Sequence, residues 1–97
     1  MKITIDTQLN IGDFIYRIEF YNGEPDTDIE NIGKVEIYGF SIDKNGVWIE
    51  NNEFGECCTK LDDIDSGKPD DYGFSYFSSK ENAVQFIEEY RNGKANN

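Results

Sequence analysis

Histidine is absent from this sequence, and its only two cysteines, Cys57 and Cys58, are adjacent. Without histidine, a serine or cysteine nucleophile lacks its usual general base, and no imidazole can move protons near neutral pH. Adjacent cysteines cannot join distant segments, and two cysteines without histidine cannot complete a four-ligand zinc site. We therefore expect a protein that is not an enzyme and that needs no cofactor.

Phosphate-binding glycine motifs and complete calcium-binding loops are also missing. Neither GxxxxGK[ST] nor GxGxxG occurs. EF-hand loops starting at Asp26 or Asp63 would need glycine at their sixth position, where the sequence has Asn31 and Lys68 instead. No metal site is expected, and an irregular calcium site within residues 62–71 is the less favoured alternative.

Long apolar runs and basic residues are scarce. No apolar run approaches the roughly 20 residues that span a bilayer, and MKITIDTQLN lacks the apolar segment of a signal peptide, which predicts a cytoplasmic protein. Nine Lys and Arg face twenty Asp and Glu, giving a net charge of −11. This charge repels phosphate backbones and anionic lipid headgroups. Direct binding to nucleic acid or to a membrane is therefore not expected.

Aromatic residues are plentiful, since fourteen of the 97 residues are Phe, Tyr or Trp, and they can fill a modest core. Apolar residues alternate with polar ones in several segments, which predicts strands at 2–5, 13–21, 34–43, 47–52 and 72–77 and a short strand near 56–61. We expect a single domain over residues 1–97 with an α+β fold. A small antiparallel sheet of four to five strands would carry one C-terminal amphipathic helix, with a curled, partly closed barrel as the alternative.

Asn45-Gly46 lies between two alternating segments and predicts a hairpin with a two-residue type I′ turn. The facing pairs in that register would be Ile42 with Ile49 and Asp43 with Trp48. The apolar phase also shifts between Ile37 and Phe40, which predicts a bulge at Gly39.

Residues 78–93 predict the helix, because Ala83, Phe86, Ile87 and Tyr90 recur at helical spacing. Ser78 and Glu81 form a capping-box pattern at its start, and Gly93 is placed to end it, with residues 94–97 expected to fray. The helix is expected to lie across the hairpin. The residues predicted to be buried together there are Ile42, Ile49, Phe86 and Ile87.

The stretch FSSKENAVQFIEEY leads from an aromatic strand end through serine, glutamate and alanine into a final helix. It resembles a pattern found in small acidic prophage and mobile-element proteins of low-GC bacteria. The likeness continues back through GKVEIYGFSIDKNGVWI and covers about half the chain. Such proteins share no single function, and the resemblance makes an anti-CRISPR role the concrete version of an inhibitory function.

The acidic residues are concentrated in the sequence. Residues 21–33 hold four acids and no base, and residues 50–65 hold six acids against Lys60 alone. If residues 26–30 are extended, their acids lie about 6.6 Å apart, twice the rise of a strand, which is similar to the spacing of phosphates on one DNA strand. The candidate partner-binding residues are Glu24, Asp26, Asp28, Glu30, Glu50, Glu53, Glu56, Asp62, Asp63, Asp65, Asp70 and Asp71. The alternative is that these acids only keep the domain soluble.

Three functions remain open from the sequence. The first is a non-catalytic inhibitor that occupies the basic nucleic-acid-binding surface of a host protein, such as a CRISPR effector nuclease. The second is an immunity or antitoxin protein that neutralises a basic nuclease toxin. The third is a binding module that uses Trp48, Tyr38 and Tyr72 on an exposed face. We expect the first, with a basic protein as the partner.

Overall fold

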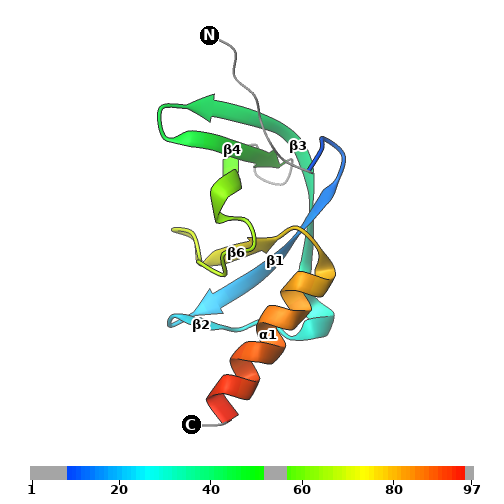
Figure 1. Cartoon of the computed structure of the whole chain (residues 1–97), viewed down its shortest axis with the longest axis vertical. Coiled ribbons are helices and arrows are strands. Elements are labelled where there is room, and N and C mark those ends of the chain that lie inside the picture. Colours follow the sequence, from blue (N-terminus) through cyan, green and yellow to red (C-terminus); the bar gives the residue numbers. More distant parts are fainter. Residues whose placement is uncertain (1–8, 52–56, 96–97) are drawn as a thin grey trace.

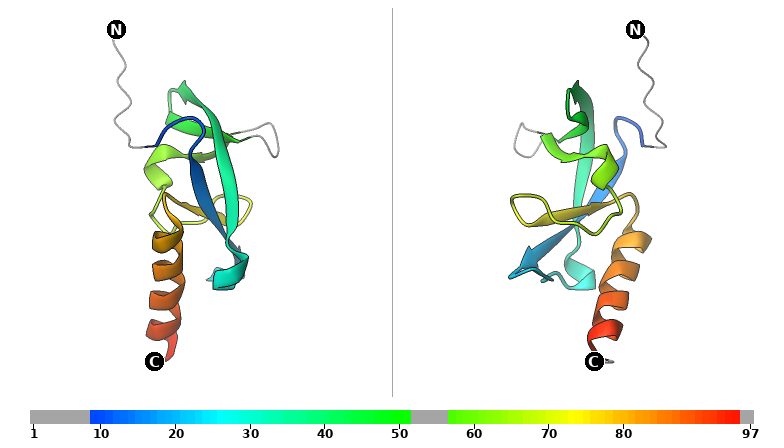
Figure 2. Two further views of the ribbon diagram at one scale, coloured as in Figure 1. Left: turned by 90° about the vertical axis from the view of Figure 1, so that its right-hand side faces the viewer. Right: turned by 60° about the vertical axis from the view of Figure 1, so that its left-hand side comes forward.

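The computed structural model describes residues 9–51 and 57–95, which form an open antiparallel sheet with a helix packed on it (Figures 1 and 2). The strands are β1 (Phe14–Tyr21), β2 (Glu24–Pro25), β3 (Gly33–Asp43), β4 (Gly46–Asn51), β5 (Cys57–Lys60) and β6 (Phe74–Phe77). The helices are the 3₁₀ turns η1 (Ile29–Asn31) and η2 (Leu61–Asp63) and the α-helix α1 (Lys80–Ala95). The predicted α+β class is confirmed. The strand predicted at residues 2–5 lies outside the described residues.

Strand β1 pairs with three other strands, β2, β3 and β6. Both β3 and β6 pair with Tyr16 and Arg17 of β1, so they lie along its opposite edges. β4 then pairs with β3, β5 pairs with β4, and the short β2 continues the edge of β1 that faces β3; every pairing is antiparallel. Within the described part of the chain β5 and β6 do not pair with each other, so the sheet stays open and the barrel alternative does not hold.

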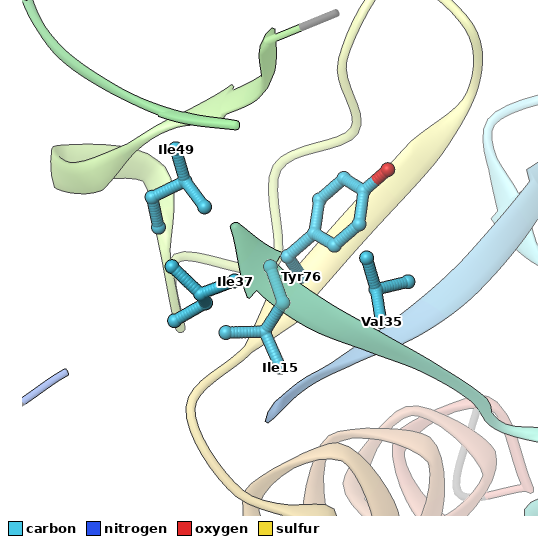
Figure 3. Close-up of a cluster of buried hydrophobic side chains, with 5 residues drawn as sticks. All are labelled: Ile15, Val35, Ile37, Ile49 and Tyr76. Atoms are coloured by element: carbon cyan, nitrogen blue, oxygen red, sulfur yellow. The ribbon is translucent and has the colours of Figure 1, made fainter. Parts of the chain in front are cut away.

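The two faces of β1 contribute to two separate cores. Ile15 packs in a buried cluster with Val35, Ile37, Ile49 and Tyr76 (Figure 3). Ile18 lies three residues further on, on the opposite face, and its buried cluster contains Phe77, Ala83 and Ile87. Because alternate strand residues point to opposite faces, one short strand joins both cores.

Helix α1 packs on β1 and β6, not on the hairpin formed by β3 and β4. Ile87 of α1 is buried against Ile18 and Phe77 in one core. Ile49 is buried in the other core, and Ile42 is 47% exposed. The prediction that these residues are buried together with Phe86 is therefore wrong. The reason is the chain connection: only Ser78 and Ser79 separate β6 from α1, so the helix must lie beside β6 and its neighbour β1.

The predicted β3–β4 hairpin forms, but its turn and register differ from the expectation. Asp43 pairs with Gly46, so Lys44 and Asn45 make the turn. Neither turn residue has a positive φ, which a type I′ turn requires. The facing pairs are Phe40 with Ile49, Ser41 with Trp48 and Ile42 with Val47, so the predicted register is wrong. The bulge is confirmed, because the register shifts between Ile37 and Gly39.

A turn of the type I′ kind occurs instead at the other Asn-Gly pair. Asn22 and Gly23 have φ values of 52° and 79°, and they connect the facing residues Tyr21 and Glu24 of β1 and β2. Positive φ at both central residues is what this turn needs. An Asn-Gly pair therefore does form a turn of the type I′ kind in this protein, but at Asn22-Gly23 and not at Asn45-Gly46.

The ends of α1 also differ from the expectation. The backbone N–H of Asn82 donates to Ser79 Oγ at 3.1 Å, so Ser79 is the N-cap and the capping box at Ser78 is wrong by one residue. At the other end the helix passes through Gly93 and reaches Ala95, so the predicted stop at Gly93 is wrong. A Cβ at Gly93 would have no neighbour within 4 Å, and this position lies on the solvent side of the helix.

Candidate functional site

The acidic segment DDIDSGKPDD, residues 62–71, lies along the free edge of β6. The N–H of Asp65 donates to the carbonyl of Tyr76 at 2.9 Å, and the N–H of Asp70 donates to the carbonyl of Phe74 at 2.8 Å. The preceding Leu61 packs on the Ile15 cluster. Since β1 pairs with the other edge of β6, this segment covers an edge that would otherwise expose its carbonyls.

Within this segment the carboxylate of Asp65 holds the start of α1. It accepts hydrogen bonds from the N–H of Ser78 at 2.9 Å and from Ser78 Oγ at 2.6 Å. Asn82 Nδ2 donates to it at 3.3 Å. A carboxylate at this position is also favoured by the partial positive charge of a helix N-terminus. Asp65, predicted to bind a partner, therefore has a structural role.

Asp70 has a comparable role in the turn before β6. Its Oδ1 accepts hydrogen bonds from the N–H groups of Tyr72 and Phe74, both at 2.9 Å. Such side-chain-to-backbone bonds replace the partners that a turn lacks. The loop thus uses two of its five carboxylates to fix its own shape. Asp62 and Asp71 are exposed, and Asp63 is half-buried.

Asp62 borders a hollow of about 900 Å³ between the start of β1, η2 and the residues that lead into α1. Asp13 and Asp65 also line it, beside the apolar side chains of Phe14 and Leu61. Asp13 accepts a hydrogen bond from the N–H of Asn10 at 2.9 Å. Among the described residues no group of three or more His, Cys, Asp or Glu is arranged to hold a metal ion.

The second acidic segment, Glu24 to Glu30, does not form the extended row that would space its acids evenly. Ile29–Asn31 is a 3₁₀ turn, which places Glu30 off the line of Asp26 and Asp28. Ile29 and Ile32 pack against the Ile18 cluster, and this burial turns the chain inward. The spacing of about 6.6 Å required residues 26–30 to be extended, and this condition does not hold at residues 29–30.

The carboxylates of this segment are nevertheless all exposed. Exposed positions include Glu24, Asp26, Asp28 and Glu30. Arg91 Nη2 donates to Asp28 Oδ1 at 3.0 Å and links the segment to α1 through a solvent-exposed ion pair. Of the candidate acids in residues 50–56, Glu50 is half-buried on β4, whereas Glu53 and Glu56 lie outside the described residues.

The hairpin end holds an arrangement that the sequence reasoning missed. Asp43 accepts hydrogen bonds from the N–H of Asn45 at 2.7 Å and from Trp48 Nε1 at 3.0 Å. The Asn45 bond first, and the Trp48 bond second, lower the pKa of Asp43 below its ordinary value of 3.8. Lys60 Nζ lies 5.2 Å from the centroid of the Trp48 ring. The available signal was an Asp two residues before Asn45, a common turn pattern.

The three aromatic residues of the third functional alternative come from different elements, namely β4, β3 and the turn before β6. Trp48 is half-buried by its contacts with Asp43 and Lys60. Tyr38 is exposed at the bulge of β3, and Tyr72 is exposed in the turn before β6. Strand β1 lies between β3 and β6, so these two tyrosines are on opposite sides of β1.

Comparison with protein-family models finds no match, and neither the curated proteins nor the solved structures contain one. Among the described helices none is long and apolar enough to cross a membrane.

Proposed function

We propose that this protein is a non-catalytic inhibitor whose acidic surface occupies a basic, nucleic-acid-binding surface of another protein. A net charge of −11 supports this proposal, because it attracts basic proteins and repels phosphate backbones. The resemblance to small mobile-element proteins makes a CRISPR effector nuclease the concrete example of a target. An immunity protein against a basic nuclease toxin would use the same surface and differ only in its partner.

The observation that carries the proposal is the exposed acidic segment from Glu24 to Glu30. Its four carboxylates are exposed, while Ile29 and Ile32 anchor the same segment to the core. A segment fixed in this way loses little conformational entropy when a partner binds. Complementary charge on such a surface accelerates association and orients the partner.

An affinity pull-down from bacterial lysate tests the proposal. We expect capture of a basic nucleic-acid-binding protein at low salt. High salt should release it by screening the charges, and double-stranded DNA should release it by competing for the basic surface of the partner. The double variant Asp26→Lys/Glu30→Lys should lose this capture. The matched control Glu81→Lys/Glu88→Lys changes the net charge equally on exposed positions of α1 and should retain it.

Both variants should unfold at nearly the wild-type temperature, because exposed charges contribute little to stability. Capture that ignores salt, DNA and the Asp26/Glu30 reversal would show that the acids do not form the binding surface.

A further inference from the structure

Two tyrosines are exposed on neighbouring chain segments at one end of the sheet. Tyr72 is 76% exposed and Tyr21 is 67% exposed. The N–H of Phe20 donates to the carbonyl of Gly73 at 2.7 Å, one step beyond the facing pair of Glu19 and Phe74. Tyr21 and Tyr72 are the next residues outward on these two segments. In Figure 1 the end of β1 and the start of β6 accordingly lie on the same side of the molecule.

Both tyrosines are held by short, well-defined turns. Tyr21 precedes the Asn22-Gly23 turn and faces Glu24 across it. Tyr72 donates its N–H to the Asp70 carboxylate, and Gly73 follows with a φ of 83°. Rigid aromatic side chains of this kind supply contact area at a low entropy cost and are frequent binding hot spots.

The charge around the tyrosines indicates what can cover them. Residues 17–28 and 68–74 contain six carboxylates against two bases, Arg17 and Lys68. Arg17 already lies 4.8 Å from the centroid of the Phe74 ring. Asp71 is exposed next to Tyr72 in the turn before β6. Asp26 is exposed on the other segment, where its N–H donates to the carbonyl of Glu19, two residues before Tyr21. An exposed aromatic face among carboxylates fits a guanidinium group, which stacks on the ring and pairs with the acid.

We propose that this surface, termed the tyrosine end and formed by Tyr21, Tyr72, Glu24, Asp26 and Asp71, receives arginine side chains of the partner protein. The inference rests on the proposed function and deepens it by naming the surface that faces the partner. It assigns binding to aromatic and acidic groups acting together. The acids at the opposite end of β6, such as Asp62, are outside this surface.

A titration with a short peptide of alternating arginine and glycine, followed by amide NMR shifts at low salt, tests the assignment. We expect the largest shifts at Tyr21, Glu24, Asp71 and Tyr72. The double variant Tyr21→Ala/Tyr72→Ala keeps the net charge and should raise the Kd of the peptide about tenfold or more, since two cation–π contacts are lost. Tyr38→Ala removes another exposed tyrosine, on β3, and should leave the Kd unchanged.

A pair of charge reversals separates local recognition from net charge. Asp26→Lys/Asp71→Lys and the control Asp62→Lys/Glu36→Lys change the net charge equally at exposed positions. The first should weaken peptide binding much more than the second. Equal weakening by both, or an unchanged Kd after loss of both tyrosines, would overturn the tyrosine end while leaving an acidic binding protein in place. Absence of peptide binding to the wild type at low salt would overturn the tyrosine end, whereas the proposed function is decided separately by the salt-dependent pull-down.

Discussion

The Asp65 carboxylate accepts two hydrogen bonds from Ser78, one from its N–H at 2.9 Å and one from its hydroxyl at 2.6 Å. These bonds join the segment that covers the edge of β6 to the first residues leading into α1. Asp65 has a φ of 65°, a conformation that Asp and Asn adopt more readily than other non-glycine residues. A residue from the acidic loop therefore determines how the helix starts.

Replacing Asp65 should destabilise the fold, because the N–H of Ser78 loses its acceptor. We expect Asp65→Ala to lower the free energy of unfolding by about 1 to 3 kcal/mol, measured by urea denaturation. Asp65→Asn keeps an acceptor oxygen and should lose less. The neighbouring exposed carboxylate offers a control, and Asp62→Ala should change stability by less than about 0.5 kcal/mol. Equal effects at the two positions would contradict the structural role of Asp65.

Gly67 lies against the ring of Phe86, and this contact should not tolerate a side chain. A Cβ at Gly67 would lie 2.5 Å from Phe86 Cε2, and the residue has a φ of 74°. Gly67→Ala should therefore cost about 2 to 4 kcal/mol in thermal or urea unfolding. Gly93→Ala is the matched change in open space and should stabilise α1 by up to about 1 kcal/mol. Destabilisation by Gly93→Ala would contradict a helix that continues past this residue.

The position of the helix can be tested with two isoleucines. Ile87→Ala removes a fully buried side chain between α1 and the sheet and should cost about 2 to 5 kcal/mol. Ile42→Ala removes a side chain that is 47% exposed near the hairpin turn and should cost about 1 kcal/mol or less. Urea unfolding of both variants measures the difference. Comparable losses would favour the helix-on-hairpin arrangement that the structure contradicts.

Ser75 has a fully buried hydroxyl without a hydrogen-bond partner in the described structure. Burial of an unpaired hydroxyl is unfavourable, so Ser75→Ala should raise the free energy of unfolding by about 1 kcal/mol. Ser66 is the contrasting case, because its Oγ donates to the carbonyl of Asp63 at 2.7 Å and accepts from the N–H of Lys68 at 3.1 Å. Ser66→Ala should destabilise, and the opposite signs are the measured result. A loss of stability in Ser75→Ala would mean that its hydroxyl is paired.

The lowered pKa of Asp43 makes the hairpin sensitive to acid. Its pKa in the folded state lies below the ordinary 3.8, because the N–H of Asn45 and then Trp48 Nε1 favour the carboxylate. The resulting stability is present above the unfolded pKa and is lost as the pH falls through the folded one. Asp43→Asn should therefore be less stable than the wild type at about pH 6, with a smaller difference below about pH 3. A difference that stays constant in urea unfolding at both pH values would exclude this linkage.

Local patterns in the sequence were sufficient for the long strands and the α-helix, but not for the short β2 or the two 3₁₀ turns. Alternation in FIYRIEFY predicted β1, helical spacing from Ala83 to Tyr90 predicted α1, and the phase shift near Gly39 predicted the bulge. These features depend on which face of an element is buried, and that choice is written in neighbouring residues. The sequence likewise determined the excess of negative charge and its concentration in two segments.

Only the tertiary structure decided how the elements and acids are used. The hairpin turn lies one residue earlier than the Asn-Gly pair suggested, and in this register the Asp43 side chain accepts hydrogen bonds from Asn45 and Trp48. The helix packs on β1 and β6, since the linker of two residues makes it begin directly beside the end of β6. Two chemically equal aspartates also have different roles, since Asp65 meets the N–H of Ser78 and Asp62 meets solvent. A carboxylate is the same in either position, and only its distance from a backbone donor in the folded chain separates a structural acid from one that faces solvent.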